Sequence, residues 1–507
     1  VAMIARILDL PIFLIFVMIA CAAMYVPALH ALVLEMYHVA RSFFYSATLG
    51  LILCALIGIA MSGRASHHNA LEHLLALFAF FAVLPVVLAV PFYEALRTTS
   101  FVNAYFEMVS SLTTTGATLF PDHTRLPSSL HLWRGIVAWS GGLMMWIAAA
   151  AILAPLNLGG FEVTTSAEPG QGGLRRFDMR AASPGQRIIR ASKRLFPIYA
   201  GLTVTLWFCL ILSGAAPLEG LMHAMATLST SGISSIGGIE ESTVGVAGEF
   251  LIFVFLLFAL SRLTFSTDTI TGRTRGLHED AEFRIGLILV IGIPVLLFLR
   301  HWIGALEINE EENIWLGVKA LWGGMFTVLS FLTTTGFVSS EWQAAQGWSG
   351  LATPGMILMG LALIGGGVAT TAGGVKLLRV FTLYLNGLRE MQKLIHPSSV
   401  SGKGVGDRRI RRQGAYTAWV FFMLFAMSMA FVTLVLTGFG ASFSDALVMS
   451  VAALSTTGPL LDVAGESPIL LTELPDAAKL CFAAASVLGR LETLAIIALL
   501  TPELWRR

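Results

Sequence analysis

The segment Phe331-Leu332-Thr333-Thr334-Thr335-Gly336 recurs in nearly the same form at three other places in this chain of 507 residues. The other copies are Ser111-Leu112-Thr113-Thr114-Thr115-Gly116, Thr227-Leu228-Ser229-Thr230-Ser231-Gly232 and Ala453-Leu454-Ser455-Thr456-Thr457-Gly458. Their glycines lie 104 to 122 residues apart, and hydrophobic stretches flank every copy. One Thr-Thr-Gly would be an ordinary turn at the end of a helix. Four copies in one register predict an internal repeat.

The composition around these segments is typical of an integral membrane protein. The chain is 56% hydrophobic and only 12% charged, with a mean hydropathy of +0.78. Soluble domains carry about 25% charged residues, so we exclude a soluble enzyme, a disordered protein and a nucleic-acid-binding protein. Four cysteines (Cys21, Cys54, Cys209 and Cys481) lie far apart in apolar stretches, which favours packing residues over a disulfide framework or a metal site.

Several stretches are long enough to cross a bilayer, which takes about 20 apolar residues. We predict spans at 7–29, 43–61, 71–93, 135–160, 195–218, 285–306, 351–375, 414–436 and 480–500, with a weaker one at 250–261 before Arg262. Shorter apolar stretches at 101–112, 220–228, 315–332 and 442–454 each precede one copy of the motif, and we expect them to be re-entrant helices. The first span is too long for a signal peptide, so we expect it to be an uncleaved helix.

Each copy therefore belongs to a unit of one span, one short helix, a Ser/Thr-Thr-Ser/Thr-Gly loop and a second span. We predict an all-α integral membrane protein with pseudo-fourfold symmetry. The predicted parts are an N-terminal transmembrane hairpin (1–66) and four pore repeats (67–165, 166–275, 276–396 and 397–507).

Charge is sorted along the chain, although the net charge is only +1. Residues 161–194 hold seven Lys or Arg against three acids, and residues 379–412 hold eight against two. Stretches 233–249, 301–315, 337–350 and 459–478 hold 12 acids and no Lys or Arg. Because positive loops stay cytoplasmic, we expect the acidic stretches and the short helices to face outward. The acids there either form a solvated rim or concentrate cations at the mouth of a pore.

The four loops suit a dehydrated cation. Irregular backbone at membrane depth is tolerated where it lines a cavity, and rings of carbonyl oxygens can replace the water shell of an ion. Glycine supplies positive φ, hydroxyls bond backbone or add a ligand, and each short helix directs its negative end at the loop. A ring without Cys, His or carboxylate favours a hard monovalent cation over zinc or copper. The candidate filter residues are Thr113, Thr114, Thr115, Gly116, Ser229, Thr230, Ser231, Gly232, Thr333, Thr334, Thr335, Gly336, Ser455, Thr456, Thr457 and Gly458.

This arrangement resembles the TrkH/KtrB/HKT superfamily of potassium transporters, and within it the TrkH/TrkG family, over essentially the whole chain. The two extra spans within 7–61 point to TrkH rather than KtrB. The matching motifs are His131-Leu132-Trp133-Arg134, Trp139-Ser140-Gly141-Gly142, Leu158-Gly159-Gly160-Phe161, Ala167-Glu168-Pro169-Gly170, Gly489-Arg490-Leu491-Glu492 and Thr501-Pro502-Glu503-Leu504-Trp505. The departures are Thr230-Ser231-Gly232 for the usual Thr-Gly-Gly, Thr456-Thr457 for Asn-Val, and Ala369-Thr370-Thr371-Ala372 for Gly-Ser-Thr-Gly. They concern potassium-over-sodium discrimination rather than the pore.

Five glycines in the ten positions 365–374 predict a break in a helix, because each costs about 0.5–1 kcal/mol relative to alanine. Close packing through small residues is the alternative, whereas the resemblance implies an intramembrane gate loop below the filter. Arg490 lies in an apolar span, where a charge costs about 2.5–3.5 kcal/mol, and Glu492 does not share its helix face. We expect Arg490 to be an electrostatic barrier paired with the closed gate. The candidate gate residues are Gly365, Gly366, Gly367, Thr370, Thr371, Gly373, Gly374, Lys376 and Arg490.

The resemblance implies potassium uptake across the bacterial inner membrane by a multi-pass homodimer whose filters face the periplasm. It also implies a cytosolic TrkA-like regulator of RCK fold that binds NAD, ATP or ADP. This chain has no Walker-type loop and no Gly-x-Gly-x-x-Gly loop after a strand, so nucleotide sensing belongs to that partner. We expect K⁺ as the transported ion, membrane lipid as a partner and no cofactor in the chain. A potential of about 150 mV supplies roughly 3.5 kcal/mol per charge, so downhill passage suffices.

Two alternatives stay open. The first is a Na⁺-dependent or weakly selective monovalent cation transporter of the same fold, similar to KtrB. The second is a membrane-embedded enzyme, which would need a convergent nucleophile, acid or metal group. His67, His68, Glu72 and His73 suggest such a group, but at the start of a span we expect them to be interface anchors.

Overall fold

The computed structural model describes residues 10–61, 70–154, 184–261, 280–305, 313–349, 354–395, 412–465 and 467–491. Within these ranges the secondary structure is entirely helical, as predicted for an all-α protein. In the described part of the chain, eight helical stretches are long and apolar enough to cross a membrane: Ile12–Val33, Tyr37–Met61, His73–Leu96, Ser128–Leu153, Arg187–Leu212, Ala281–Leu299, Trp315–Leu332 and Gly414–Gly438.

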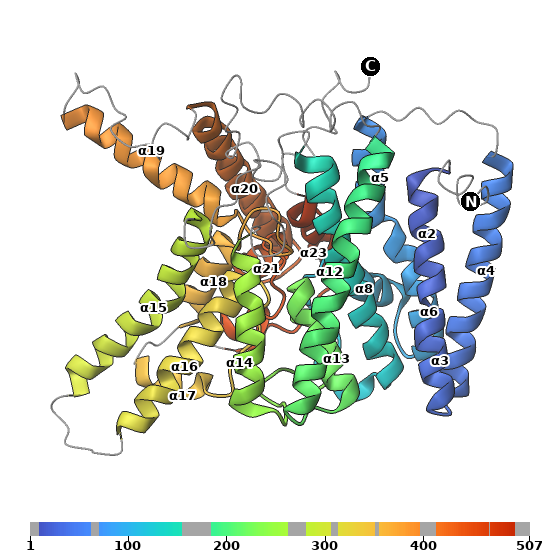
Figure 1. Ribbon diagram of the computed structural model, residues 1–507, viewed down its shortest axis with the longest axis horizontal. Coiled ribbons are helices and arrows are strands. Elements are labelled where there is room, and N and C mark those ends of the chain that lie inside the picture. The colour runs from blue at the N-terminus through green and yellow to red at the C-terminus, as the bar shows by residue number, and fades with distance from the viewer. Residues whose placement is uncertain are drawn as a thin grey trace.

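The N-terminal part is a helical hairpin at one edge of the molecule (Figure 1), made of α2 (Ile12–Ala23), α3 (Tyr25–Val33) and α4 (Tyr37–Met61). The predicted first span is two helices joined at Met24, because Pro27 has no N–H for the carbonyl of Ala23. The third predicted span, 71–93, divides in the same way into α5 (Ala70–Ala82) and α6 (Leu84–Leu96), beside Pro85. Proline therefore breaks both spans without ending them.

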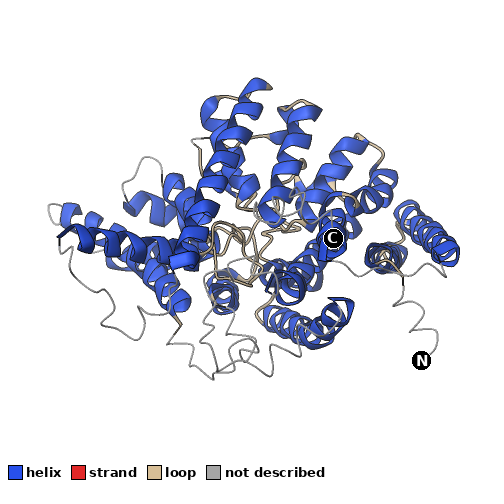
Figure 2. Ribbon diagram, turned by 90° about the horizontal axis from the view of Figure 1, so that it is seen from above, coloured by secondary structure: helices blue, strands red, loops and turns tan. Residues whose placement is uncertain are grey.

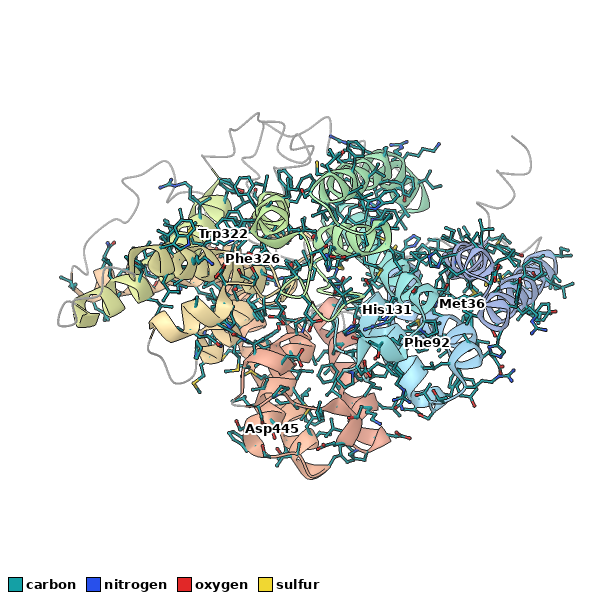
Figure 3. The ribbon with its side chains drawn as sticks, turned by 90° about the horizontal axis from the view of Figure 1, so that it is seen from below. Met36, Phe92, His131, Trp322, Phe326 and Asp445 are labelled. Carbon is teal, nitrogen blue, oxygen red and sulfur yellow. The ribbon has the colours of Figure 1, made fainter. Side chains whose placement is uncertain are left out.

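The remaining elements follow in chain order and surround the loops gathered at the centre in Figure 2. They are α7 (Phe101–Leu112), η1 (His123–Arg125), α8 (Ser128–Ala148), η2 (Ala149–Leu153), α12 (Pro184–Leu212), α13 (Pro217–Ser229), α14 (Gly245–Leu256), η3 (Leu257–Leu260), α15 (Ala281–Ala305), α16 (Asn313–Leu332), α17 (Trp342–Ser349), α18 (Gly355–Ile364), α19 (Leu377–Ile395), α20 (Arg412–Gly438), α21 (Phe443–Leu454), α22 (Leu460–Val463), η7 (Leu471–Glu473) and α23 (Asp476–Leu491). Seen from below in Figure 3, Trp322 and Phe326 of α16 lie on one side of this centre and Phe92 and His131 on the other.

Two further predicted elements differ from those observed. The stretch 315–332 is part of α16, a helix of 20 residues that is itself long enough to cross a membrane. The predicted span 351–375 is wrong beyond Ile364, where α18 ends after only 10 residues. Gly365 has φ +73° and ψ 177° there, a conformation that glycine adopts without steric cost. The glycine-rich sequence therefore interrupts the helix, as its composition predicted.

Small residues let two helices approach the loops closely. A methyl group on Gly141 of α8 would lie 1.9 Å from the carbonyl oxygen of Leu112, the last residue of α7. A methyl group on Gly489 of α23 would lie 2.2 Å from the carbonyl oxygen of Leu454, the last residue of α21. These distances leave no room for a side chain, so both glycines fix how near each helix lies to a loop.

Candidate ion-binding site

The four motif copies form loops at the ends of four helices. Loop 1 (113–116) follows α7, loop 2 (229–232) begins at the end of α13, loop 3 (333–336) follows α16 and loop 4 (455–458) follows α21. The middle threonine of each is left-handed, with φ of +55° at Thr114, +51° at Thr230, +58° at Thr334 and +54° at Thr456. A β-branched residue in this region is an outlier that costs about 1–2 kcal/mol. The surrounding structure must therefore hold each threonine there.

Hydrogen bonds that cap the C-terminus of each helix hold the threonines in this conformation. In loop 1 the N–H of Thr115 donates to the carbonyl of Ser110 at 2.8 Å, and the N–H of Thr114 donates to that of Ser111 at 2.9 Å. This is the Schellman pattern, with threonine where glycine is usual. The bond to the carbonyl five residues earlier recurs at Ser231 (3.0 Å), Thr335 (2.9 Å) and Thr457 (2.8 Å).

The first and third hydroxyls of each loop bond within it. The first donates to the carbonyl four residues earlier, at 2.7 Å for Thr113, 2.7 Å for Ser229, 2.9 Å for Thr333 and 2.7 Å for Ser455. It also lies within hydrogen-bonding distance of the third hydroxyl, at 2.8, 3.0, 3.1 and 3.1 Å for loops 1 to 4. These hydroxyls are therefore committed to the loop itself, which leaves backbone oxygens as the more available ligands.

The structure brings all four loops together. A methyl group on Gly116 would lie 2.0 Å from the carbonyl oxygen of Ser231, and one on Gly232 would lie 2.2 Å from that of Thr335. The N–H of Gly458 donates to the carbonyl of Thr115 at 2.6 Å, which joins loop 4 to loop 1.

Pro459, the residue after loop 4, contacts the glycines of the other loops. Methyl groups on Gly232 and Gly336 would lie 2.9 and 2.8 Å from its ring, and one on Gly116 would lie 3.6 Å away. The loops predicted as a filter thus lie close together, next to Pro459.

The glycine-rich segment 365–376, here called the gate loop, lies against loops 3 and 4. The N–H of Gly373 donates to the hydroxyl of Thr334 at 2.7 Å. A methyl group on Gly373 would lie 2.1 Å from the carbonyl oxygen of Ser455. The hydroxyl of Thr371 donates to the carbonyl of Leu228 at 3.1 Å, at the base of loop 2. The gate loop is therefore bonded or packed to three of the four loop bases.

Basic side chains also bond the gate loop. Arg490 is 2% exposed, and its Nη1 donates to the carbonyl of Thr371 at 2.6 Å. Lys376 is buried, and its Nζ donates to the carbonyl of Ala372 within the loop. The contact joins Arg490 to the gate loop; its role as a barrier paired with the closed gate stays a prediction.

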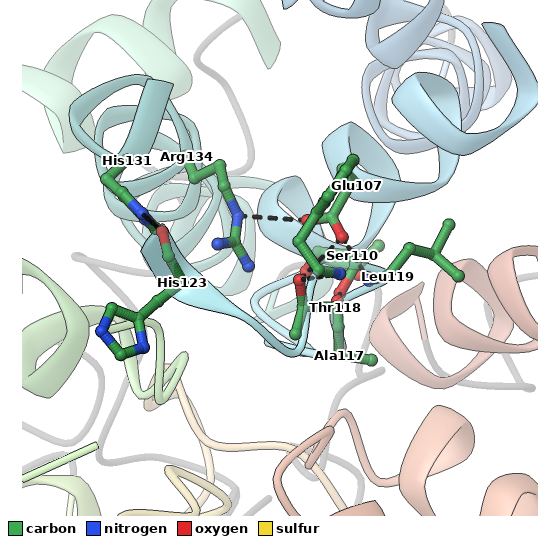
Figure 4. Close-up of polar contacts among 10 residues, drawn as sticks. Glu107, Ser110, Ala117, Thr118, Leu119, His123, His131 and Arg134 are labelled. Carbon is green, nitrogen blue, oxygen red and sulfur yellow. Dashed lines mark hydrogen bonds and ion pairs between the residues drawn. The ribbon is translucent and has the colours of Figure 1, made fainter. Parts of the chain in front are cut away.

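Three buried carboxylates hold loop backbone, and the sequence analysis did not single them out. Figure 4 shows Glu107 of α7 bonded to the chain just after loop 1 and paired with Arg134 of α8, whose Nε lies 3.1 Å from Oε2. Glu249 was counted among the outward acids, but it is 0% exposed. It accepts from the N–H of Ser340 at 2.6 Å. Glu282 of α15 accepts from the N–H of Val368 in the gate loop at 2.9 Å.

Two acids near the loops have raised pKa values. Asp462 of α22 is exposed, yet surrounding protein removes part of its hydration and raises its pKa to about 6. Desolvation, with the nearby charges of Glu241 and Asp462, also raises the pKa of Glu240. These carboxyls lie just after loops 4 and 2 in sequence, so they can supply the local negative charge predicted for the mouth of a pore.

Some predicted residues lie outside the described ranges. His67, His68 and the motifs at 158–161, 167–170 and 501–505 are among them. His73 is buried in α5.

Comparisons with known proteins agree over most of the chain. Residues 48–506 match the family described as TrkH, cation transport protein. The chain is 29% identical over 441 residues to the Trk system potassium uptake protein TrkH of Escherichia coli (strain K12), covering 86% of each. It is 28% identical over 435 residues to the Trk system potassium uptake protein TrkG of the same strain, covering 84% of each. It is also similar to the crystal structure of the potassium transporter TrkH from Vibrio parahaemolyticus, with a TM-score of 0.79, 26% identity and coverage of 98% of this chain and 99% of that chain.

Proposed function

The chain belongs to the TrkH family of cation transport proteins, and we propose that it carries potassium into the cell through the space between loops 1 to 4. It is a transporter and not an enzyme. The Trk relatives are potassium uptake proteins, and the membrane spans give this chain the same setting. K⁺ is the transported ion, and the chain needs no cofactor.

The observation that carries this proposal is the convergence of the four loops with their first and third hydroxyls already bonded. Backbone oxygens then form the ligand set, as in carbonyl-lined filters. The carbonyl of Thr115 accepts the N–H of Gly458, and a potassium ion bound at this level would replace that donor. We infer that the four loop-bearing units are repeats about a pseudo-fourfold axis, with the divisions predicted from sequence.

The gate loop closes this path from below. Its bonds to Thr334, Leu228 and Arg490 hold it against the loops, and opening requires that they break. The positive charge of Arg490 also repels cations on their way through. Together these contacts support a closed gate that has a discrete open alternative.

The setting follows from charge placement and from the family. Lys- and Arg-rich stretches at 161–194 and 379–412 stay cytoplasmic, so the loops face the periplasm of a bacterial inner membrane. We further infer a homodimer with one pore per protomer. A cytosolic TrkA-like subunit of RCK fold would sense nucleotide and act on the gate loop.

Potassium uptake in potassium-requiring cells tests the proposal with Gly336→Ser. Its side chain would meet Pro459 at 2.8 Å in a backbone with φ +83°, so we expect growth at low potassium to fail. Gly440→Ser is the matched control, because Gly440 has φ +100° and nothing within 4 Å. Equal growth of both variants would refute a filter at loop 3. Wild-type Rb⁺ uptake that requires Na⁺ would identify the KtrB-like alternative, which the potassium uptake relatives do not favour.

A further inference from the structure

One position on each loop-bearing helix recurs in the same relation to its loop. The residues nine positions before the loop glycines are Glu107 on α7, His223 on α13, Thr327 on α16 and Met449 on α21. All four are buried, with exposed fractions of 0%, 1%, 0% and 0%. Three are polar, and a polar group buried at membrane depth requires a partner.

In loop 1 that partner is the chain that leaves the loop. Oε1 of Glu107 accepts from the hydroxyl of Thr118 at 2.8 Å and from the N–H of Leu119 at 2.5 Å. These residues come two and three positions after Gly116 (Figure 4). Oε2 lies 3.1 Å from Nε of Arg134. Hydrogen bonds to a carboxylate are shorter and stronger than those between neutral groups.

Loops 2 and 3 repeat the relation with other chemistry. Nε2 of His223 shares a hydrogen bond of 3.1 Å with the hydroxyl of Ser234, two positions after Gly232. The hydroxyl of Thr327 accepts from the N–H of Ser339, three positions after Gly336, at 3.3 Å. Glu249 strengthens this support from α14, because it accepts from the hydroxyl of Ser339 at 2.7 Å.

Loop 4 is supported differently. Met449 offers no strong donor or acceptor, and its loop is instead joined to loop 1 through the N–H of Gly458. Loop 1 is thus the one to which loop 4 bonds directly. A shift of the chain after loop 1 would therefore move two of the four loops.

We propose that the residue nine positions before a loop glycine holds the two or three residues that follow that glycine, here called the loop exit. We further propose that Glu107 has the strongest effect on the spacing of the ion-binding oxygens. This inference rests on the proposed function. Carbonyls held at a fixed spacing discriminate between ions of different size, and a loosened exit lets them close around Na⁺. Glu107 acts through Thr118 and Leu119 and touches no ion, so it is a positioning residue.

The test is the ratio of Na⁺ to K⁺ permeation in proteoliposomes of the purified full chain, measured from reversal potentials. Glu107→Gln removes the charge, and Thr118→Val removes one donor while it leaves the pair with Arg134 intact. We expect the Na⁺/K⁺ ratio to rise about tenfold in Glu107→Gln and about two- to tenfold in Thr118→Val, the range that follows from one lost hydrogen bond. A merely structural role would lower the yield of folded protein without changing the ratio.

Two matched controls separate this effect from general damage. Glu94→Gln removes an exposed carboxylate paired with Arg97 at 3.3 Å, and Thr124→Val removes a hydroxyl bonded to exposed Asp122 at 2.6 Å. Both should keep the wild-type ratio. If Thr118→Val also keeps it, the positioning inference is wrong while potassium transport stands. If the wild-type chain itself conducts no K⁺, the proposed function fails and this inference with it.

Discussion

Removing the guanidinium of Arg490 should open the gate in a graded way. Its bond to the carbonyl of Thr371 is 2.6 Å long and buried, and a hydrogen bond that involves a charged group contributes about 1.5–3 kcal/mol. Arg490→Met keeps a side chain of similar length without a donor. Because a free-energy change of about 1.4 kcal/mol changes an equilibrium constant tenfold, the ratio of open to closed pores should rise about 10- to 150-fold.

The assay is the open fraction of single pores in planar bilayers, with bulk Rb⁺ uptake in proteoliposomes as a second readout. Arg97→Gln is the control, because Arg97 is exposed and pairs only with exposed Glu94 among the contacts described. The Na⁺/K⁺ ratio of Arg490→Met should stay near wild type, since the bond removed is to Thr371 of the gate loop. A monodisperse Arg490→Met protein with a wild-type open fraction would refute the reasoning.

Three further outcomes follow from contacts of the gate and the acids. Gly373→Ala places a methyl group 2.1 Å from the carbonyl oxygen of Ser455, so the gate loop should separate from the filter and basal Rb⁺ leak should rise severalfold. Glu282→Gln weakens the 2.9 Å bond from the N–H of Val368 and should raise leak about two- to tenfold, measured in the same flux assay. The pKa of Asp462 is about 6, so its charge is lost as external pH falls through 6 and the apparent KM for K⁺ should rise; Asp462→Asn should have the higher KM at pH 7.5 and no such step.

The positions of the loops could be predicted because their signal is repetition. Thr-Thr-Gly is common, but its recurrence at 116, 336 and 458 with a close relative at 232 predicted related environments, and the structure brings these segments together. The break after Ile364 could be predicted for a similar reason, since five glycines outweigh an apolar pattern.

Helix boundaries were predicted less well, because hydropathy omits polar residues that find buried partners. The span expected from 135 begins at Ser128 in the structure, and Arg134 lies inside the helix since Glu107 compensates its charge. Glu249 was counted among the acids of an outward stretch, but it is buried because it has hydrogen-bond partners inside the protein. No local sequence pattern indicates that its carboxylate accepts hydrogen bonds from three donors that lie 73 to 91 residues later in the chain.

The left-handed threonines could not be predicted either. Local preference argues against positive φ at a β-branched residue, so the motif indicated glycine as the flexible position. The Schellman bonds and the paired hydroxyls outweigh that preference at Thr114, Thr230, Thr334 and Thr456. Tertiary contacts therefore determine the backbone conformation of these threonines, against their intrinsic conformational preference.

The unequal supports of the loops have a consequence for how the proposed pore can diversify. Glutamate, histidine, threonine and methionine occupy corresponding places in a single polypeptide, whereas an assembly of identical subunits would carry any substitution four times. A mutation at one of these places changes the support of one loop, together with loop 4 where the change is at loop 1, and not of all four loops at once. Ion preference can thus be adjusted in small steps during evolution, each mild enough for the cell to survive.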